Sequence, residues 1–105
     1  MANTAKVLFR GAATTTLTTE LYVVPSATTT VITSIAVTNA GASSRAFTLS
    51  LGTAGSEVKL FDAATIAANT TTVIDLKQVL TAAQVIDGGA DSTDVKFHIS
   101  GMEIA

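Results

Sequence analysis

Short runs in which apolar and polar residues alternate predict that this chain is built from β-strands. In the run from Arg45 to Gly52, every second position is apolar, with Phe47, Leu49 and Leu51, and the residues between them are polar or small. The run from Thr30 to Asn39 shows a similar pattern. A period of two is typical of strands that bury one face and leave the other open.

The rest of the chain contains further short strands, separated by turn residues. Their expected bounds are 6–10, 20–24, 58–61, 71–76 and 95–103. The turn cluster Asn39–Ser44 predicts that residues 30–52 form a β-hairpin. The segment 76–84 is expected to cross between sheets, with a short helical turn on its apolar stripe.

About seven to eight short strands, and no segment long enough for a helical crossover, predict an antiparallel fold. We therefore expect a single all-β domain over residues 1–105, an antiparallel β-sandwich or jelly roll. Its core should consist of the apolar residues that alternate along the clearest strands: Val31, Ile35, Val37, Phe47, Leu49, Leu51, Phe97 and Ile99. His98 lies between two of these residues and is expected to point away from the core.

Composition sets this chain apart from an ordinary soluble domain. Charged residues make up 13% of its 105 residues, against about 25% in typical domains, and the formal net charge is -2. No apolar run approaches the ~18 residues of a membrane helix, and the first residues lack the basic and apolar regions of a signal peptide. No basic patch is available to hold nucleic acid, and there is no cysteine. We therefore expect neither a membrane nor a nucleic acid as partner.

A surface rich in threonine, serine and alanine favours a component of a larger assembly. Few charges would have to leave water when a partner covers such a surface, so the cost of desolvation is low. Threonine is also a good strand former, and a β-rich chain explains the same composition. Composition leaves both interpretations open.

No group of residues has the spacing of a catalytic or cofactor site. His98 is the only histidine, and Ser100 shares its strand face, but no acid is placed to orient the imidazole. Asp87, Asp91 and Asp94 surround a Gly-Gly pair, but their spacing matches no calcium loop, and we expect a solvated turn between two strands there. We therefore expect a protein that is not an enzyme, with no cofactor and no metal site.

Carbohydrate binding is an alternative from another functional class. Sugar-binding sandwiches usually stack their ligands on exposed aromatic rings. This chain has four phenylalanines, at strand positions typical of a core, and no tryptophan. Tyr22 is the aromatic residue that we would expect to face a sugar in an attachment module.

Three segments resemble parts of small virion structural proteins of tailed bacteriophages. They are Leu21–Ser26 (LYVVPS), Thr29–Asn39 (TTVITSIAVTN) and the closing Phe97–Ile104 (FHISGMEI). The resemblance implies a virion component. Together with the compact size and the charge-poor surface, it leads us to expect a capsid decoration (cement) protein, a β-sandwich bound in many copies to the outside of a phage head. Its partners would be the major capsid protein and copies of itself in a trimer, and its location would be the virion. A tail, head-fibre or spike component is the alternative within the same class.

The N-terminal residues are candidates for the contact with a partner. Residues 1–6 are expected to form an arm, and its contact residues are Ala2, Asn3, Thr4, Ala5 and Lys6, which carry no periodic apolar pattern. Such an arm can add a strand to the sheet edge of a neighbour, where backbone hydrogen bonds provide the affinity. The alternative is that these residues begin the first strand of the chain's own sandwich.

Overall fold

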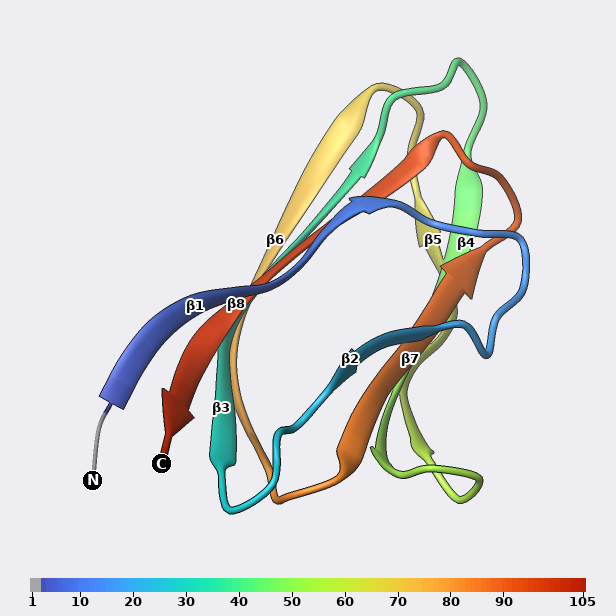
Figure 1. The fold of residues 1–105 in the computed structure, drawn as a ribbon. Helices are drawn as coiled ribbons and strands as arrows, with labels where there is room; N and C mark the ends of the chain where they lie inside the picture. The colour runs from blue at the N-terminus through green and yellow to red at the C-terminus, as the bar shows by residue number, and fades with distance from the viewer. Residues whose placement is uncertain (1–2) are drawn as a thin grey trace.

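A computed structural model describes residues 3–105, which form eight strands in two antiparallel sheets (Figure 1). The strands are β1 (Asn3–Ala12), β2 (Glu20–Val23), β3 (Thr29–Asn39), β4 (Arg45–Thr53), β5 (Val58–Ile66), β6 (Thr70–Leu80), β7 (Gln84–Ala90) and β8 (Val95–Ile104). One sheet has the order β1-β8-β3-β6, and the other has the order β2-β7-β4-β5. The all-β sandwich expected from the sequence is confirmed. Within the described residues, no helix is long and apolar enough to cross a membrane.

The hydrophobic core fills the space between the two sheets. Phe97 of β8 is fully buried and makes an edge-to-face contact with Phe47 of β4, with ring centroids 6.1 Å apart. His98, the next residue along β8, is exposed, as its place in the alternation predicts. Seven of the eight residues predicted for the core are buried: Ile35, Val37, Phe47, Leu49, Leu51, Phe97 and Ile99.

Val31 is the exception, because β3 contains a bulge. The register of β3 against both of its neighbours shifts between Ile32 and Ser34, which leaves Thr33 as an extra residue relative to β8. A bulge resets the alternation of side chains along a strand. Ile32 is therefore fully buried, and Val31 lies half-buried on the outer face. A strict period of two assigns the wrong residue to the core on the N-terminal side of the bulge.

The hairpin predicted for residues 30–52 is wrong, because β3 and β4 belong to opposite sheets. Asn39, at the end of β3, is fully buried and holds the connection between them. Its side-chain nitrogen donates to the carbonyl oxygens of Ser43 (2.8 Å) and Ile66 (3.2 Å), and its side-chain oxygen accepts from the N–H of Gly41 (3.0 Å). These bonds satisfy backbone groups of a segment that crosses from one sheet to the other.

The prediction that residues 76–84 cross between the sheets is confirmed, because β6 and β7 belong to opposite sheets, but the helical turn predicted there is wrong. Strand β6 continues to Leu80, and after a turn at residues 81–83 the chain returns as β7 in the opposite sheet. Both of these strands bury side chains against the core cluster, including Leu76, Leu80 and Ile86. An isolated helix this short is unstable in water, and strand pairing satisfies the same backbone groups along the whole segment.

The Gly-Gly pair expected in a solvated turn lies inside β7 instead. Gly88 and Gly89 are both buried. A side chain added to Gly88 would collide with Leu49, and one added to Gly89 would collide with the backbone carbonyl of Thr16. The two glycines therefore allow the core on one face, and the β1–β2 connection on the other, to approach the strand closely.

Candidate interaction surface

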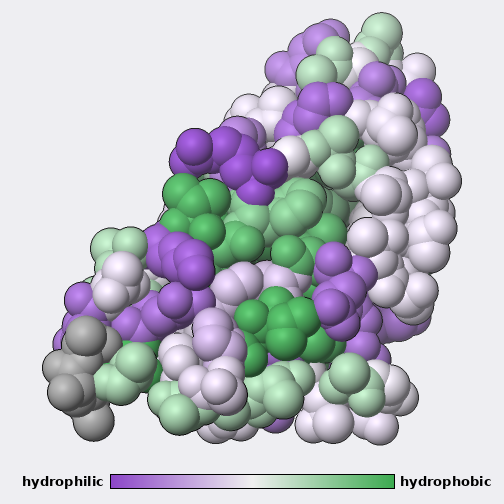
Figure 2. Space-filling view, viewed as in Figure 1, coloured by the Kyte–Doolittle hydropathy of each residue, from purple (hydrophilic) through white to green (hydrophobic). Residues whose placement is uncertain are grey.

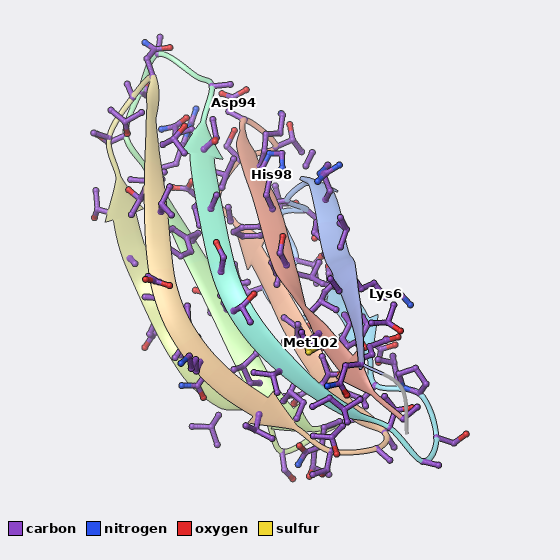
Figure 3. The ribbon with its side chains drawn as sticks, turned by 90° about the vertical axis from the view of Figure 1, so that its left-hand side faces the viewer. Lys6, Asp94, His98 and Met102 are labelled. Atoms are coloured by element: carbon purple, nitrogen blue, oxygen red, sulfur yellow. The ribbon has the colours of Figure 1, made fainter. Side chains whose placement is uncertain are left out.

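Figure 3 looks onto the outer face of the sheet β1-β8-β3-β6. Its two central strands, β8 and β3, carry little charge on this face, whereas the edge strands add Arg10 and Asp75, which lie opposite His98 and Ser34. His98 and Met102 lie on this face, and the cross-strand neighbours of His98 are Arg10 and Ala36, neither of which is an acid. The outward residues of the two central strands are mostly small, hydroxyl-bearing or apolar: Val31, Thr33, Ser34, Ala36, Thr38, Lys96, His98, Ser100 and Met102. We call this set the neutral face.

Hydroxyl groups on the neutral face already form hydrogen bonds within the sheet. The Thr33 hydroxyl donates to the carbonyl oxygen of Ser100 at 3.3 Å, and the hydroxyls of Thr38 and Thr71 are 2.9 Å apart. A polar group that keeps its hydrogen bond when water is excluded costs much less to bury than one that loses it. A partner could therefore cover this face at a low cost in desolvation.

The residues predicted to form an N-terminal arm belong to the chain's own sandwich in this structure. Asn3–Lys6 lie in β1 and pair antiparallel with the last residues of β8, while Ala2 lies outside the described residues. Lys6 Nζ is 3.4 Å from the carboxylate of Glu103. This position agrees with the alternative interpretation, in which these residues begin the first strand of the chain's own sandwich. Contact of these residues with a partner stays a prediction, and β1 has one edge unpaired in the sheet.

Tyr22, the residue predicted to face a sugar, instead joins the two sheets. Its hydroxyl is 2.8 Å from that of Thr30 and donates a hydrogen bond to the carboxylate of Glu103. Burial, and then the bond to Glu103, raises the pKa of Tyr22 to about 12. Because Tyr22 lies on β2 and its two partners lie on β3 and β8, the group links the sheets across the sandwich. Sequence patterns gave no signal for this contact, which depends on the three-dimensional placement of three strands.

Within residues 3–105, no aromatic ring is fully exposed as a stacking platform. Phe47 and Phe97 are buried, and Phe9, Tyr22 and Phe61 are half-buried. Phe61 packs on Phe47 with ring centroids 5.5 Å apart, as part of the core. Since sugar recognition usually relies on exposed rings, the geometry of the described residues does not favour the carbohydrate-binding alternative.

A buried carboxyl group lies on the outer face of the other sheet. Asp87 of β7 is only 6% exposed, and in the strand register it lies beside Glu20 of β2 and Ser50 of β4. Burial, and then a hydrogen bond with Glu57, raises the pKa of Asp87 to about 7, while the same bond lowers the pKa of Glu57. Of the two carboxyl groups, Asp87 is therefore the one that keeps its proton to the higher pH.

The other two aspartates noted in the sequence lie in the turn before β8. Asp91 accepts a hydrogen bond from the N–H of Ala46 at 3.3 Å, and a carboxylate oxygen of Asp94 lies 4.0 Å from the guanidinium of Arg45. Both therefore have structural partners in β4. In residues 3–105, no group of three or more His, Cys, Asp or Glu side chains is arranged to hold a metal ion.

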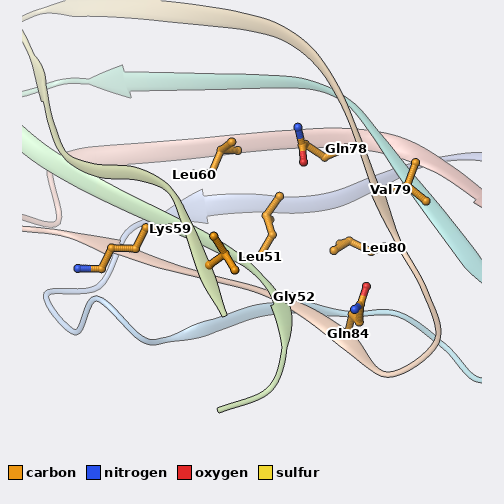
Figure 4. A pocket seen from close by; sticks show the side chains of 9 residues that line it. Leu51, Gly52, Lys59, Leu60, Gln78, Val79, Leu80 and Gln84 are labelled. Atoms are coloured by element: carbon orange, nitrogen blue, oxygen red, sulfur yellow. The ribbon is translucent and has the colours of Figure 1, made fainter. Parts of the chain in front are cut away.

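A hollow of about 240 Å³ lies at the edge of the sandwich where β5 meets β6 (Figure 4). Its lining is largely aliphatic, with two glutamines and a lysine: Leu51, Gly52, Val58, Lys59, Leu60, Gln78, Val79, Leu80 and Gln84. Val58 and Val79 are 73% and 63% exposed. Small-molecule sites usually enclose about 300–1,000 Å³. The hollow therefore suits one or two aliphatic side chains better than a cofactor.

Comparisons with known proteins give a structural likeness and no family. No protein-family model matches the chain, and no curated protein matches it. Among solved structures, the chain resembles part of the endo-1,4-β-D-xylanase 10B of Clostridium thermocellum, in a structure of its CBM22-1 and GH10 modules complexed with xylohexaose. The likeness has a TM-score of 0.43 and 18% sequence identity, and it covers 80% of this chain and 18% of the xylanase chain.

Proposed function

We propose that this chain is a structural protein of a bacteriophage particle, a capsid decoration protein that binds the outside of the head through the neutral face. The observation that supports this proposal is the neutral face itself, a sheet surface on two central strands whose outward side chains include one lysine, Lys96, and no carboxylate. The resemblance of three sequence segments to phage virion proteins supports a phage particle as the assembly. The proposed work is mechanical and requires no catalytic residue.

The size of the sandwich is sufficient for such a contact. A stable protein interface buries about 800 Å² on each partner, which is about 15% of the 5348 Å² that this chain exposes. Few charges on the neutral face would have to lose their hydration when the capsid covers it. Each copy would bridge neighbouring capsid subunits, and the sum of many such contacts would resist the pressure of the packaged DNA.

The experiment compares particles assembled with and without this chain by electron microscopy. A decoration protein should appear as additional density on the outside of the head. Density on the tail alone would contradict the proposal and favour the tail, fibre or spike alternative. Binding of the purified chain to a glycan array, with no binding to particles, would favour an attachment module.

A substitution then tests whether the neutral face makes the contact. Ala36→Glu places a charge at the centre of this face and should abolish co-sedimentation with particles that lack the chain. Ala54→Glu is the matched control, because Ala54 is exposed in the turn between β4 and β5. The control should bind as the wild type does, and both variants should keep its thermal midpoint. Full binding by the Ala36→Glu variant would refute the role of the neutral face.

A further inference from the structure

The large apolar side chains that remain exposed lie at the two edges of the sandwich. Within the described residues there are six of them: Val7, Leu17, Val23, Val58, Val73 and Val79. The first three lie on β1, β2 and the segment between them, and the other three lie on β5 and β6. The four central strands, β8, β3, β7 and β4, carry none of the six. Three of these six side chains therefore belong to each of two opposite edges, and those on β5 and β6 are the more exposed.

The edge strands do carry charges, Lys6 and Arg10 on β1 and Asp75 and Lys77 on β6, but exposed aliphatic side chains lie among them. Natural sandwiches place charges and prolines on their edge strands, because an unpaired edge invites pairing with another chain. Here β1 and β6 contain no proline, and each leaves one side of its backbone unpaired in the sheet. Figure 2 looks onto the β1–β2 edge and shows a hydrophobic area there with polar side chains around it. Such an area, rimmed by polar groups, is typical of an interface.

We propose that copies of this chain join head to tail, with the β1–β2 edge of one copy against the β5–β6 edge of the next. Strand directions permit this contact in both sheets at once. From β1 to β6 the direction reverses at each of three antiparallel pairings, and the same holds from β2 to β5. If a neighbouring copy is related to the first by a rotation about an axis parallel to the strands, its strands keep the same directions. Strand β1 of one copy then lies antiparallel to β6 of the neighbour, and β2 lies antiparallel to β5 of the neighbour.

In the proposed contact between β1 of one copy and β6 of the next, the two strands also match in length and charge. Strand β1 has ten residues and β6 has eleven. The cross-strand register puts Ala5 in one row with Val79, and Arg10 in one row with Val73. Asp75 lies two rows from Arg10 and on the same face, so the cation on one edge would lie diagonally across from the acid on the other. The hollow between β5 and β6 gives room for aliphatic side chains of the incoming edge.

A contact between two different edges has a consequence for assembly. Each copy keeps one free edge after the first contact, so copies add until the rotation closes a ring. A closed ring leaves no unpaired edge, which explains how the chain tolerates valines at these positions. This inference concerns contacts between copies and does not depend on the capsid as partner. It holds or fails independently of the proposed function.

The test uses two variants, each of which disables one edge. Val7→Lys acts on the β1–β2 edge and Val79→Lys on the β5–β6 edge, and both positions are exposed, so both variants should fold. Ser44→Lys is the matched control, because Ser44 is exposed in the turn between the central strands β3 and β4. In sedimentation velocity at micromolar concentrations, the wild type and the control should form a closed oligomer. Each edge variant alone should be at least ~10-fold weaker in association.

The mixture of the two edge variants gives the decisive measurement. Each variant retains the edge that the other lacks, so an equimolar mixture should form a one-to-one dimer that does not grow further. A wild-type chain that stays monomeric overturns the proposal. So does a Val79→Lys variant that still assembles as the wild type does, or a mixture that forms no dimer. If either variant has a lowered thermal midpoint, Val23→Lys and Val58→Lys repeat the test on the same two edges.

Discussion

The arrangement of β8 makes opposite predictions for two adjacent residues. Phe97 is fully buried and contacts Phe47 at a centroid distance of 6.1 Å, whereas His98 is exposed on the neutral face. Replacing a buried phenylalanine by alanine costs about 3–5 kcal/mol, because apolar contacts are lost and a cavity remains. Replacing an exposed side chain that has no special role changes stability by about 0.5 kcal/mol or less.

These magnitudes can be compared with the stability of the whole domain. Small domains unfold with a free energy of about 5–15 kcal/mol, so Phe97→Ala would remove a large fraction of it. In a domain of this size, each kcal/mol shifts the thermal midpoint by about 4–8 °C. We therefore expect the Phe97→Ala variant to melt at least ~12 °C below the wild type. His98→Ala should melt within a few degrees of it.

The assay is thermal and urea unfolding followed by circular dichroism, with the Phe97→Leu variant as an intermediate. Leucine refills much of the space, so this variant should lose only about 1–2 kcal/mol. The order of stability should therefore be wild type and His98→Ala together, then Phe97→Leu, then Phe97→Ala. A larger loss for His98→Ala than for Phe97→Ala would refute the register of β8, because a shift of one residue exchanges the two faces of a strand.

Three further predictions concern other parts of the structure. The pKa of Asp87 is about 7 in the folded chain and 3.8 ordinarily, so between pH 3.8 and 7 the folded state binds a proton that the unfolded state has lost. The free energy of unfolding, measured with urea, should therefore fall as the pH rises through this window and then level off. Asp87→Asn should abolish the fall. Tyr22→Phe removes hydrogen bonds to a carboxylate and a hydroxyl and should cost about 1–3 kcal/mol, and in wild type the tyrosinate absorbance should appear only near pH 12. Oxidation of a double variant with cysteines at Ala5 and Val79 should cross-link copies into closed rings, whereas cysteines at Ala5 and Thr71, at opposite ends of the strands, should not.

Hydrophobic alternation was sufficient to predict the fold class and most of the core. It worked best where a strand keeps a strict period of two, as in β4, where Phe47, Leu49 and Leu51 are all buried. It failed at Val31, because a bulge depends on how β3 pairs with its neighbours, and no local pattern marks the extra residue. It also missed β7, whose glycines suggest a turn but permit close packing of Thr16 and Leu49.

The pairing of strands and the candidate surfaces were harder to predict than the strands themselves. The turn after β3 contains residues typical of a hairpin, but the buried side chain of Asn39 bonds to Ile66, 27 positions further on, and directs the chain into the opposite sheet. Such a bond connects segments that are distant in sequence, so alternation cannot indicate it. The N-terminal residues Asn3–Lys6 have no apolar pattern, yet they are strand because β8 provides a partner. For the neutral face and for the two edges of the sandwich, the signal in the sequence was the low charge of the chain. A low total charge does not indicate which residues form a surface.

The high hydropathy and the low charge of this chain have a common explanation in the placement of its apolar side chains. A sandwich of 105 residues has one core, and that core is filled by the inward residues of its strands. The valines at the two edges lie outside it, and in a solitary chain they would expose apolar surface whose burial is worth about 25 cal/mol per Å². A chain that stays monomeric gains nothing from these residues and risks aggregation through them. A chain whose edges meet those of its copies, and whose neutral face lies on a larger assembly, buries the same residues and has few charges to desolvate. The composition is therefore consistent with the proposed role as a subunit, and the six exposed side chains lie where the proposed contact between copies would cover them.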